Sequence, residues 1–145
     1  MRASVLGAAA LLITLAACAG RGGGPRPIVM GTPCAACGMR IQDLRYACEG
    51  ERDGAYHVYD SIECLLRAQP PSARAWLADY DTQALHAADS LWVVRAEIPS
   101  PMGGGYAAFL DRAAADGIAS TKNGRVARLS EFAAGAGSDS ATGRP

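Results

Sequence analysis

Sulfur-bearing side chains are concentrated in one short stretch of the chain. Cys34 and Cys37 have the spacing CxxC, and Gly38 and Met39 follow directly. Two cysteines three positions apart in a tight turn can direct both sulfurs at one ion, and Gly38 lets the chain bend away without a Cβ clash. Thiolate and thioether ligands favour Cu(I), whereas structural zinc requires four Cys or His ligands and gains nothing from methionine. The pattern therefore predicts a Cu(I) site at Cys34, Cys37 and Met39.

The CxxC motif also has other interpretations. A redox-active dithiol normally begins a helix that follows a strand, but the residues before Cys34 are Gly31-Thr32-Pro33, which do not predict a strand. Apart from Cys18 the chain has four cysteines, and in an oxidising compartment these allow three disulfide pairings, among which the sequence does not choose. A thiol-disulfide oxidoreductase and a binding module held together by disulfides or zinc therefore remain alternatives.

Further candidate metal ligands lie elsewhere in the chain. Met102 follows Pro101 and precedes three glycines, so it belongs to a loop rather than to an apolar helical stripe, and it can face the sulfur cluster. Cys64 falls on a predicted helix, where a buried inert thiol is the default interpretation. His57 falls in a predicted strand, where a core or surface imidazole is the simpler interpretation. We keep Cys64 and His57 as secondary ligand candidates.

The sequence contains no recognisable catalytic arrangement. It lacks a nucleophile elbow, an HExxH motif and a carboxylate pair with the spacing of an acid and base, so we expect a protein that is not an enzyme. The chain has 14 Lys and Arg against 14 Asp and Glu, which gives a formal net charge of zero. Because phosphate binding requires clustered basic side chains, we expect no nucleic-acid partner.

Residues 1–17 have the features of a bacterial lipoprotein signal peptide. A short positive region, Met1-Arg2, precedes an apolar stretch that is too short for a permanent transmembrane helix, and Leu15-Ala16-Ala17-Cys18 follows. We expect cleavage before Cys18 and lipidation of its sulfur, so that acyl chains anchor the mature protein to the membrane. Ala19 replaces the aspartate that commonly retains lipoproteins in the inner membrane. This favours a periplasm-facing protein of the outer membrane.

Composition divides the mature chain into three parts. Residues 18–28 are rich in Gly and Pro and predict a flexible tether, and residues 135–145 are small, polar and aperiodic, which predicts a disordered tail. Residues 29–134 form one domain of ordinary size. A break at Gln69-Pro70-Pro71-Ser72 divides this domain into two halves.

The first half predicts the order strand, turn, strand, helix. We expect a strand near residues 45–48, a hairpin turn over residues 50–54 and a second strand over residues 56–59. Asp60 is a candidate helix N-cap, and Glu63 three residues later completes a capping box.

The second half predicts strands over residues 76–80 and 91–96. A Gly-rich turn, a helix over residues 106–116 that stops at Gly117 and a last strand over residues 125–129 complete it. The fold class is therefore α+β, with antiparallel sheet segments and two main helices.

Together these motifs resemble the NosL family, the accessory lipoproteins of nitrous-oxide reductase. The resemblance covers nearly the whole mature chain. CxxCGM with a downstream Pro-Met-Gly in a small lipoprotein is a fairly specific combination. The residues that carry it are Cys18, the CxxCGM of residues 34–39, Val58-Tyr59-Asp60-Ser61 before the helix with Cys64, Ala78-Asp79-Tyr80, the AADSLWVV of residues 87–94, and Pro101-Met102-Gly103 followed by Ala108-Phe109.

The resemblance implies a membrane-anchored, periplasm-facing protein that binds Cu(I) and serves copper-centre assembly in nitrous-oxide reductase beside an ABC-type transporter complex. It implies a fold of two small ββαβ-like halves. By the same similarity, four residues carry over as copper ligands, and Cys64 and His57 remain secondary. The four are Cys34, Cys37, Met39 and Met102.

Overall fold

The computed structural model describes residues 23–68 and 73–136. The predicted signal peptide, Cys18, the break at residues 69–72 and residues 137–145 lie outside these ranges. Within them no helix is long and apolar enough to span a membrane. In chain order the elements are η1 (Leu44–Tyr46), β1 (Cys48–Arg52), β2 (Ala55–Tyr59), α1 (Ile62–Ala68), β3 (Ala75–Ala78), β4 (Leu85–Ala87), η2 (Ala88–Ser90), β5 (Trp92–Arg95), β6 (Tyr106–Phe109), α2 (Arg112–Thr121), β7 (Arg125–Ala127) and α3 (Leu129–Ala136).

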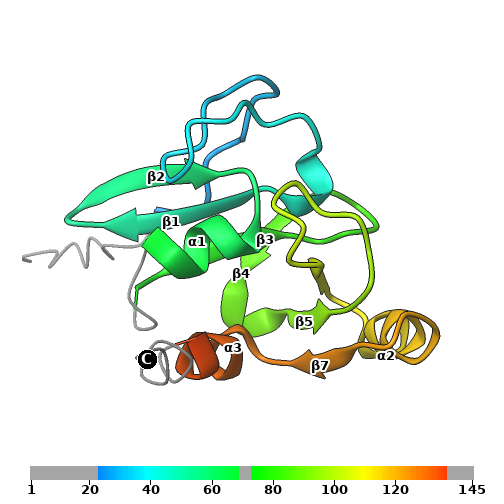
Figure 1. Cartoon of the computed structure of the whole chain (residues 1–145). Helices are drawn as coiled ribbons and strands as arrows, with labels where there is room; N and C mark the ends of the chain where they lie inside the picture. Colours follow the sequence, from blue (N-terminus) through cyan, green and yellow to red (C-terminus); the bar gives the residue numbers. More distant parts are fainter. Residues whose placement is uncertain (1–22, 69–72, 137–145) are drawn as a thin grey trace, which may run out of the picture.

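Each half of the domain folds in the order strand, strand, helix, strand (Figure 1). In the first half β1 pairs with both β2 and β3, and β4 extends the sheet to the order β2-β1-β3-β4. In the second half β5 pairs with both β6 and β7, which gives the order β6-β5-β7. All of these strand pairs are antiparallel. The α+β class and the two ββαβ-like halves are confirmed, and β4 and α3 are additions to the expected pattern.

The first hairpin differs from its prediction in position. The region near residues 45–48 is mostly the short 3₁₀ helix η1 rather than a strand, and β1 begins at Cys48. β1 then continues to Arg52, so the turn contains only Asp53 and Gly54, whose φ angles are 54° and 75°. A two-residue turn with both residues in the left-handed region matches the twist of the two strands, which explains why Asp-Gly occupies it.

The helix predicted over residues 106–116 is wrong in its first part. Tyr106–Phe109 is strand β6, which pairs with β5 and buries Phe109. The side chain of Asp111 accepts a hydrogen bond from the backbone N–H of Ala113 at 2.9 Å and so caps α2, which passes through Gly117 and ends at Thr121. Long-range pairing with β5 thus outweighs the local helical pattern, because it buries apolar side chains that a helix here would leave exposed.

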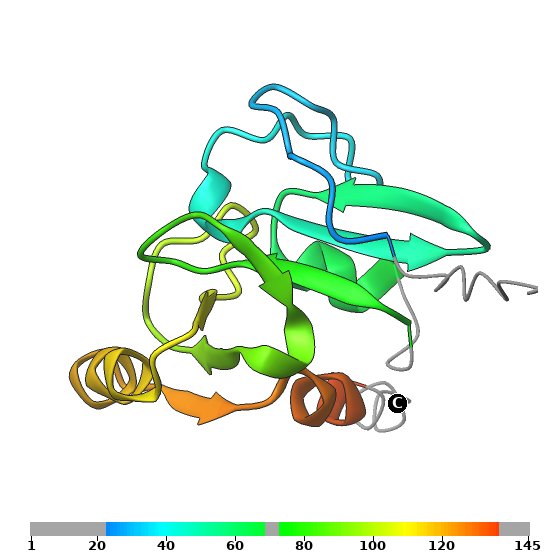
Figure 2. The same cartoon turned by 180° about the vertical axis from the view of Figure 1, so that it is seen from behind.

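The two faces of the first sheet have different covers. Helix α1 lies against one face and contacts β1 and β2 (Figure 1). Residues 23–28, which are the later part of the predicted tether, cross the opposite face (Figure 2). The backbone N–H of Arg26 donates to the buried carboxylate of Glu49 at 2.7 Å, and its guanidinium lies 4.2 Å from the ring centre of Tyr56. This arrangement leaves the α1 side for the metal site described below.

A buried carboxylate connects the two halves. Asp79 is 3% exposed, and its Oδ1 accepts from the backbone N–H of Leu110 at 2.9 Å while Oδ2 accepts from the backbone N–H of Thr82 at 3.1 Å. Next to it, the N–H of Tyr80 donates to the carbonyl of Ala108 at 2.7 Å. These contacts fix the orientation of one half relative to the other.

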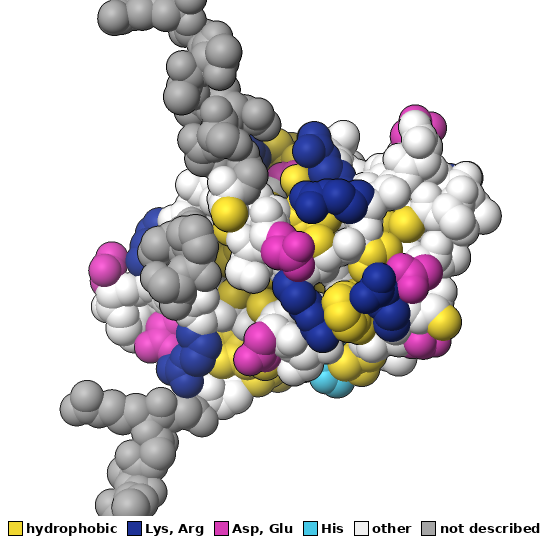
Figure 3. Space-filling view, turned by 90° about the horizontal axis from the view of Figure 1, so that it is seen from below, with side chains coloured by type: hydrophobic (Ala, Val, Ile, Leu, Met, Phe, Trp, Pro, Cys, Tyr) yellow, Lys and Arg dark blue, Asp and Glu magenta, His cyan; other side chains and the backbone are white. Residues whose placement is uncertain are grey.

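Basic side chains on the lower face of the molecule pack on aromatic rings. Figure 3 shows Lys and Arg mixed with hydrophobic and acidic side chains on the side where α2, β7 and α3 lie. Arg112 and Arg128 lie 4.2 Å and 3.4 Å from the ring centre of Trp92, and Arg125 lies 4.2 Å from that of Phe132. These arginines therefore contribute to packing through cation–π contacts.

Candidate metal centre

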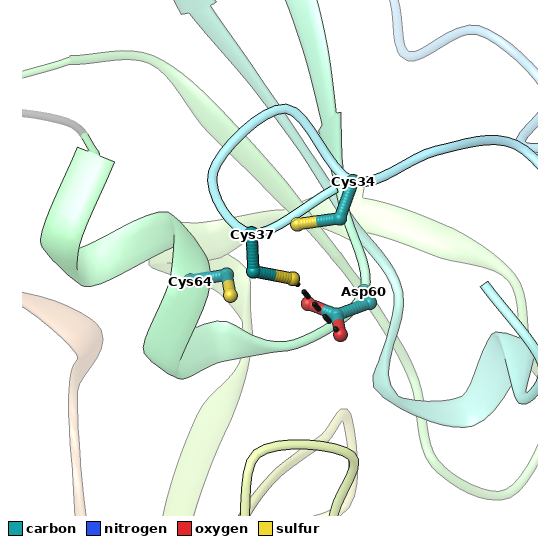
Figure 4. Close-up of side chains that lie close together, drawn as sticks. All are labelled: Cys34, Cys37, Asp60 and Cys64. Carbon is teal, nitrogen blue, oxygen red and sulfur yellow. Dashed lines mark hydrogen bonds between the residues drawn. The ribbon is translucent and has the colours of Figure 1, made fainter. Parts of the chain in front are cut away.

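Four side chains converge beside α1. Each of Cys34, Cys37, Asp60 and Cys64 offers one ligand atom, and these atoms all lie within 4.8 Å of one another. Figure 4 shows them directed toward a common point from three segments: the CxxC loop, the end of β2 and helix α1. Such a group can hold one metal ion, so the CxxC motif is completed here by residues far from it in sequence.

Local hydrogen bonds shape the CxxC loop. The N–H of Cys34 donates to the carbonyl of Met39 at 2.8 Å, and the N–H of Gly38 donates back to the carbonyl of Cys34 at 2.9 Å. Gly38 has a φ of 76°, a left-handed conformation that glycine adopts without a Cβ clash. The N–H of Ala35 donates to the carbonyl of Val58 at 2.8 Å. The last contact attaches the loop to β2 and brings its sulfurs close to Asp60, the residue that follows that strand.

Asp60 was predicted as the N-cap of the helix, and this assignment is wrong. The hydroxyl of Ser61 accepts from the backbone N–H of Cys64 at 3.3 Å, so Ser61 caps α1. The carboxylate of Asp60 is thereby released from capping and faces the sulfurs, and its Oδ2 accepts from the thiol of Cys37 at 3.6 Å. Its Oδ1 is buried and has no hydrogen-bond partner among the described residues.

The cluster is closed on most sides and open at Cys37. Cys34, Asp60 and Cys64 are 3%, 2% and 0% exposed, whereas Cys37 is exposed as a residue while its sulfur points into the cluster (Figure 4). Three ligands are therefore held in place by the core, and the fourth lies at the surface. An ion can enter or leave on that side.

The surroundings of Cys37 and Cys64 favour the protonated form of both thiols. Desolvation raises the pKa of Cys37, and the nearby Asp60 charge adds to this effect. Burial also raises the pKa of Cys64, followed by its interaction with Asp60, and the guanidinium of Arg67 partly opposes this shift. Both shifts disfavour negative charge on these two sulfurs, and a cation that replaced their protons would compensate that charge.

The donor set fits a metal ion. Three sulfurs suit a soft ion such as Cu(I), and a buried carboxylate oxygen without a partner is the kind of orphaned polar atom that an ion would satisfy. Three thiolates and one carboxylate also supply the four ligands of tetrahedral Zn(II). The arrangement supports metal binding and restricts the ion to these soft or borderline cations.

The remaining predicted ligands lie in different surroundings. Met39 is 44% exposed and lines, together with Asp60, a groove of about 540 Å³ next to the cluster. Met102 packs against the hydrophobic core and lines a shallow pocket with Glu63 and Arg67 of α1. His57 lies in β2 opposite Gly50 and is not a member of the four-residue group. The structure therefore brings Cys64 to the CxxC cysteines, places Met39 at the edge, and leaves the other two apart.

Asp60 is the functional residue that sequence reasoning missed as a ligand candidate. The signal was present in the sequence, because Asp60 and Ser61 are adjacent and both are good N-cap residues. Only one of them can cap α1. Which one does so depends on where β2 ends, and the helical pattern alone does not give that position.

Comparisons with known proteins agree with this fold. No family model matches the chain, and no curated protein matches it in sequence. The crystal structure of the copper chaperone NosL from Shewanella denitrificans is similar, with a TM-score of 0.64 and 16% sequence identity over 72% of this chain and 92% of that one. At this identity the similarity establishes the fold alone, and the chain also carries a cysteine and aspartate cluster able to hold a metal ion.

Proposed function

We propose that the protein is a Cu(I)-binding accessory protein, a metallochaperone, rather than an enzyme. The observation that carries this proposal is the convergence of three cysteine sulfurs and the Asp60 carboxylate within 4.8 Å, in a group of which three side chains are buried. Its fold is similar to that of a copper chaperone, which supports the same function. Copper is the cargo of this site.

The open side of the site suits transfer. Cys34 and Cys64 hold the ion from the protein interior, and the exposed Cys37 leaves room for a ligand of the acceptor to enter before the first set departs. Met39 lies on the same side, along the groove that Asp60 also lines. Binding requires reduced thiols, so a disulfide between Cys34 and Cys37 abolishes it.

The proposal also states where the protein lies in the cell and which enzyme it serves. The lipoprotein signal of residues 1–17 supports lipidation at Cys18 and a periplasm-facing position, with the outer membrane favoured by Ala19. The motifs that resemble the NosL family support nitrous-oxide reductase as the client and an ABC-type transporter complex as a neighbour. A Cys18→Ser variant is expected in the soluble rather than the membrane fraction of cells. Loss of the gene is expected to leave nitrous-oxide reductase without copper.

The decisive experiment is competition with a colorimetric Cu(I) chelator under reducing conditions. We expect Cys34→Ser, Cys37→Ser and Cys64→Ser each to lower the Cu(I) affinity at least about tenfold, because each removes one soft ligand. Cys48→Ala is the matched control, since Cys48 is a buried thiol that donates to the carbonyl of Tyr46 and is outside the group.

The methionines are tested in the same titration. Met39→Ala and Met102→Ala measure whether either thioether joins the cysteines when copper is bound. Wild-type affinity in all three cysteine variants would overturn the proposed function.

Zinc binding is the second candidate function, and the Asp60 oxygen in the cluster favours it. Metal analysis of protein purified without added metal, followed by competition between Cu(I) and Zn(II), separates the two ions. A thiol-disulfide oxidoreductase is disfavoured: Cys34 is buried, so the exposed Cys37 is the thiol that could attack a disulfide, and its pKa is raised, whereas such enzymes lower the pKa of the attacking thiol. Reduction of insulin disulfides by the purified domain would restore that alternative.

A further inference from the structure

One cation contacts the sulfur cluster directly. Arg67, three residues after Cys64 on α1, donates a hydrogen bond from Nη2 to the Cys64 sulfur at 3.2 Å. Its side chain is exposed and lines a shallow pocket of α1 with Met102 and Tyr106. The guanidinium therefore lies between solvent and the sulfur that the core buries most completely.

The carboxylate of Glu63 does not form an ion pair with Arg67. Glu63 precedes Arg67 by four positions on α1, a spacing at which acidic and basic side chains normally pair. Instead, Oε1 of Glu63 accepts from the hydroxyl of Ser100 at 2.8 Å. No ion pair between Glu63 and Arg67 occurs among the described residues.

The Gly-rich loop of residues 99–105 explains why Glu63 bonds Ser100 rather than Arg67. The backbone of Gly104 approaches Glu63 so closely that a Cβ added there would lie 2.6 Å from the Glu63 side chain. The loop of residues 99–105 thus holds the Glu63 side chain through Ser100 and the backbone of Gly104. Arg67 is left to bond the sulfur of Cys64.

We propose that Arg67 is a specificity-determining positioning residue that biases the site toward a monovalent ion. This inference rests on the proposed metal site and assigns a role to a residue outside it. A fixed positive charge beside the cluster compensates part of the negative charge that three thiolates and a carboxylate bring to a Cu(I) complex. It repels a divalent ion twice as strongly as a monovalent ion at the same point.

Other nearby cations do not have this role. Arg40 lines the adjoining groove, but its Nη1 donates to the carbonyl of Gly31 at 2.9 Å. Arg45 lines the same groove and is paired with Asp43 at 2.6 Å. Among the described residues, Arg67 is the one cation whose side chain donates a hydrogen bond to any of the four clustered side chains.

The test compares the ratio of Cu(I) to Zn(II) affinity in four proteins: wild type, Arg67→Gln, Arg67→Lys and Arg40→Gln. Each affinity is measured by chelator competition with the single metal ion as probe. We expect Arg67→Gln to lower the ratio roughly tenfold, the effect of one unit charge at about 5 Å in a partly screened environment. Arg67→Lys keeps the charge and is expected to stay within about threefold of wild type. Arg40→Gln is the control and is expected to leave the ratio unchanged.

The outcomes separate this inference from the proposed function. A merely structural role of Arg67 would lower both affinities together and leave the ratio unchanged, and that result overturns the inference. Wild-type protein that binds Cu(I) tightly with an unaltered ratio in Arg67→Gln overturns the inference alone, whereas wild-type protein that binds no Cu(I) overturns both. Thermal unfolding of the metal-free variants serves as the folding control, because Arg67 is exposed and its replacement by Gln is expected to change the unfolding temperature little.

Discussion

At the scale of single residues, Asp60 changes the chemistry of the site most. Without it, the cluster would be three thiols, a purely soft site. With it, a buried oxygen that has no partner among the described residues is added, and the thiols beside it lose protons less readily. These are unfavourable features that a bound cation would relieve, as is common where function determines the placement of polar groups.

The raised pKa values of the clustered thiols predict that the metal affinity depends on pH. Because the pKa values of Cys37 and Cys64 are raised, both thiols hold protons at neutral pH, and metal binding as thiolates must release them. We expect the Cu(I) affinity to rise as pH increases from 6 to 8, by up to about tenfold per unit for each proton released. Chelator competition at several pH values measures this slope. An affinity independent of pH over this range would mean that the thiols are already ionised.

At the scale of elements, the two halves repeat the order strand, strand, helix, strand, and among the described residues the cluster of cysteines and aspartate lies in the first half. Ser61 and Asp111 occupy the same place, one residue before α1 and α2, and both cap their helix. Leu110 stands where the first half has Asp60, and Ala114 stands where it has Cys64. The repeat therefore supplies the scaffold. These two differences in sequence distinguish the half with the cysteine and aspartate cluster from the other half.

The two caps provide a matched pair of variants. Ser61→Ala and Asp111→Ala each remove a side-chain acceptor from a helix N-terminus, so each is expected to lower the free energy of unfolding by about 1 kcal/mol. Only Ser61→Ala removes a contact to the backbone of Cys64. We expect it alone to weaken Cu(I) binding severalfold in the chelator titration. Equal affinities in the two variants would show that the cap does not position the ligand.

At the scale of the whole molecule, the position of the site depends on how the two halves are joined. Helix α1 of the first half contacts β6 of the second, and the loop of residues 99–105 reaches back to Glu63 of α1. Asp79 holds the junction through hydrogen bonds to both halves. The metal site therefore belongs to the first half but is supported by the second.

Removal of the junction carboxylate should destabilise the whole fold. Asp79→Ala leaves the N–H groups of Leu110 and Thr82 without their acceptors, and we expect the free energy of unfolding to fall by about 2 to 4 kcal/mol. Asp81→Ala, at an exposed position two residues later, is the control and should change it by less than about 0.5 kcal/mol. Urea denaturation measures both. Similar midpoints for the two variants would refute the role assigned to Asp79.

Short-range patterns in the sequence predict the sulfur ligands of the CxxC motif and much of the local structure. The CxxC motif at Cys34 and Cys37, the strand before Asp60 and the helix with Cys64 all follow from short-range patterns, which act over a few residues and can be read in one sequence. The α+β class follows from the order of such segments.

Contacts between distant segments determine which of these residues lie together in space. The pairing of β6 with β5 turned a predicted helix into a strand, and the attachment of the CxxC loop to Val58 placed its sulfurs over Asp60. Similarly, because Glu63 accepts a hydrogen bond from Ser100, Arg67 donates its hydrogen bond to the sulfur of Cys64. These contacts depend on the free energy gained when segments far apart in the sequence bury surface against each other. A pattern of a few neighbouring residues carries no information about that free energy.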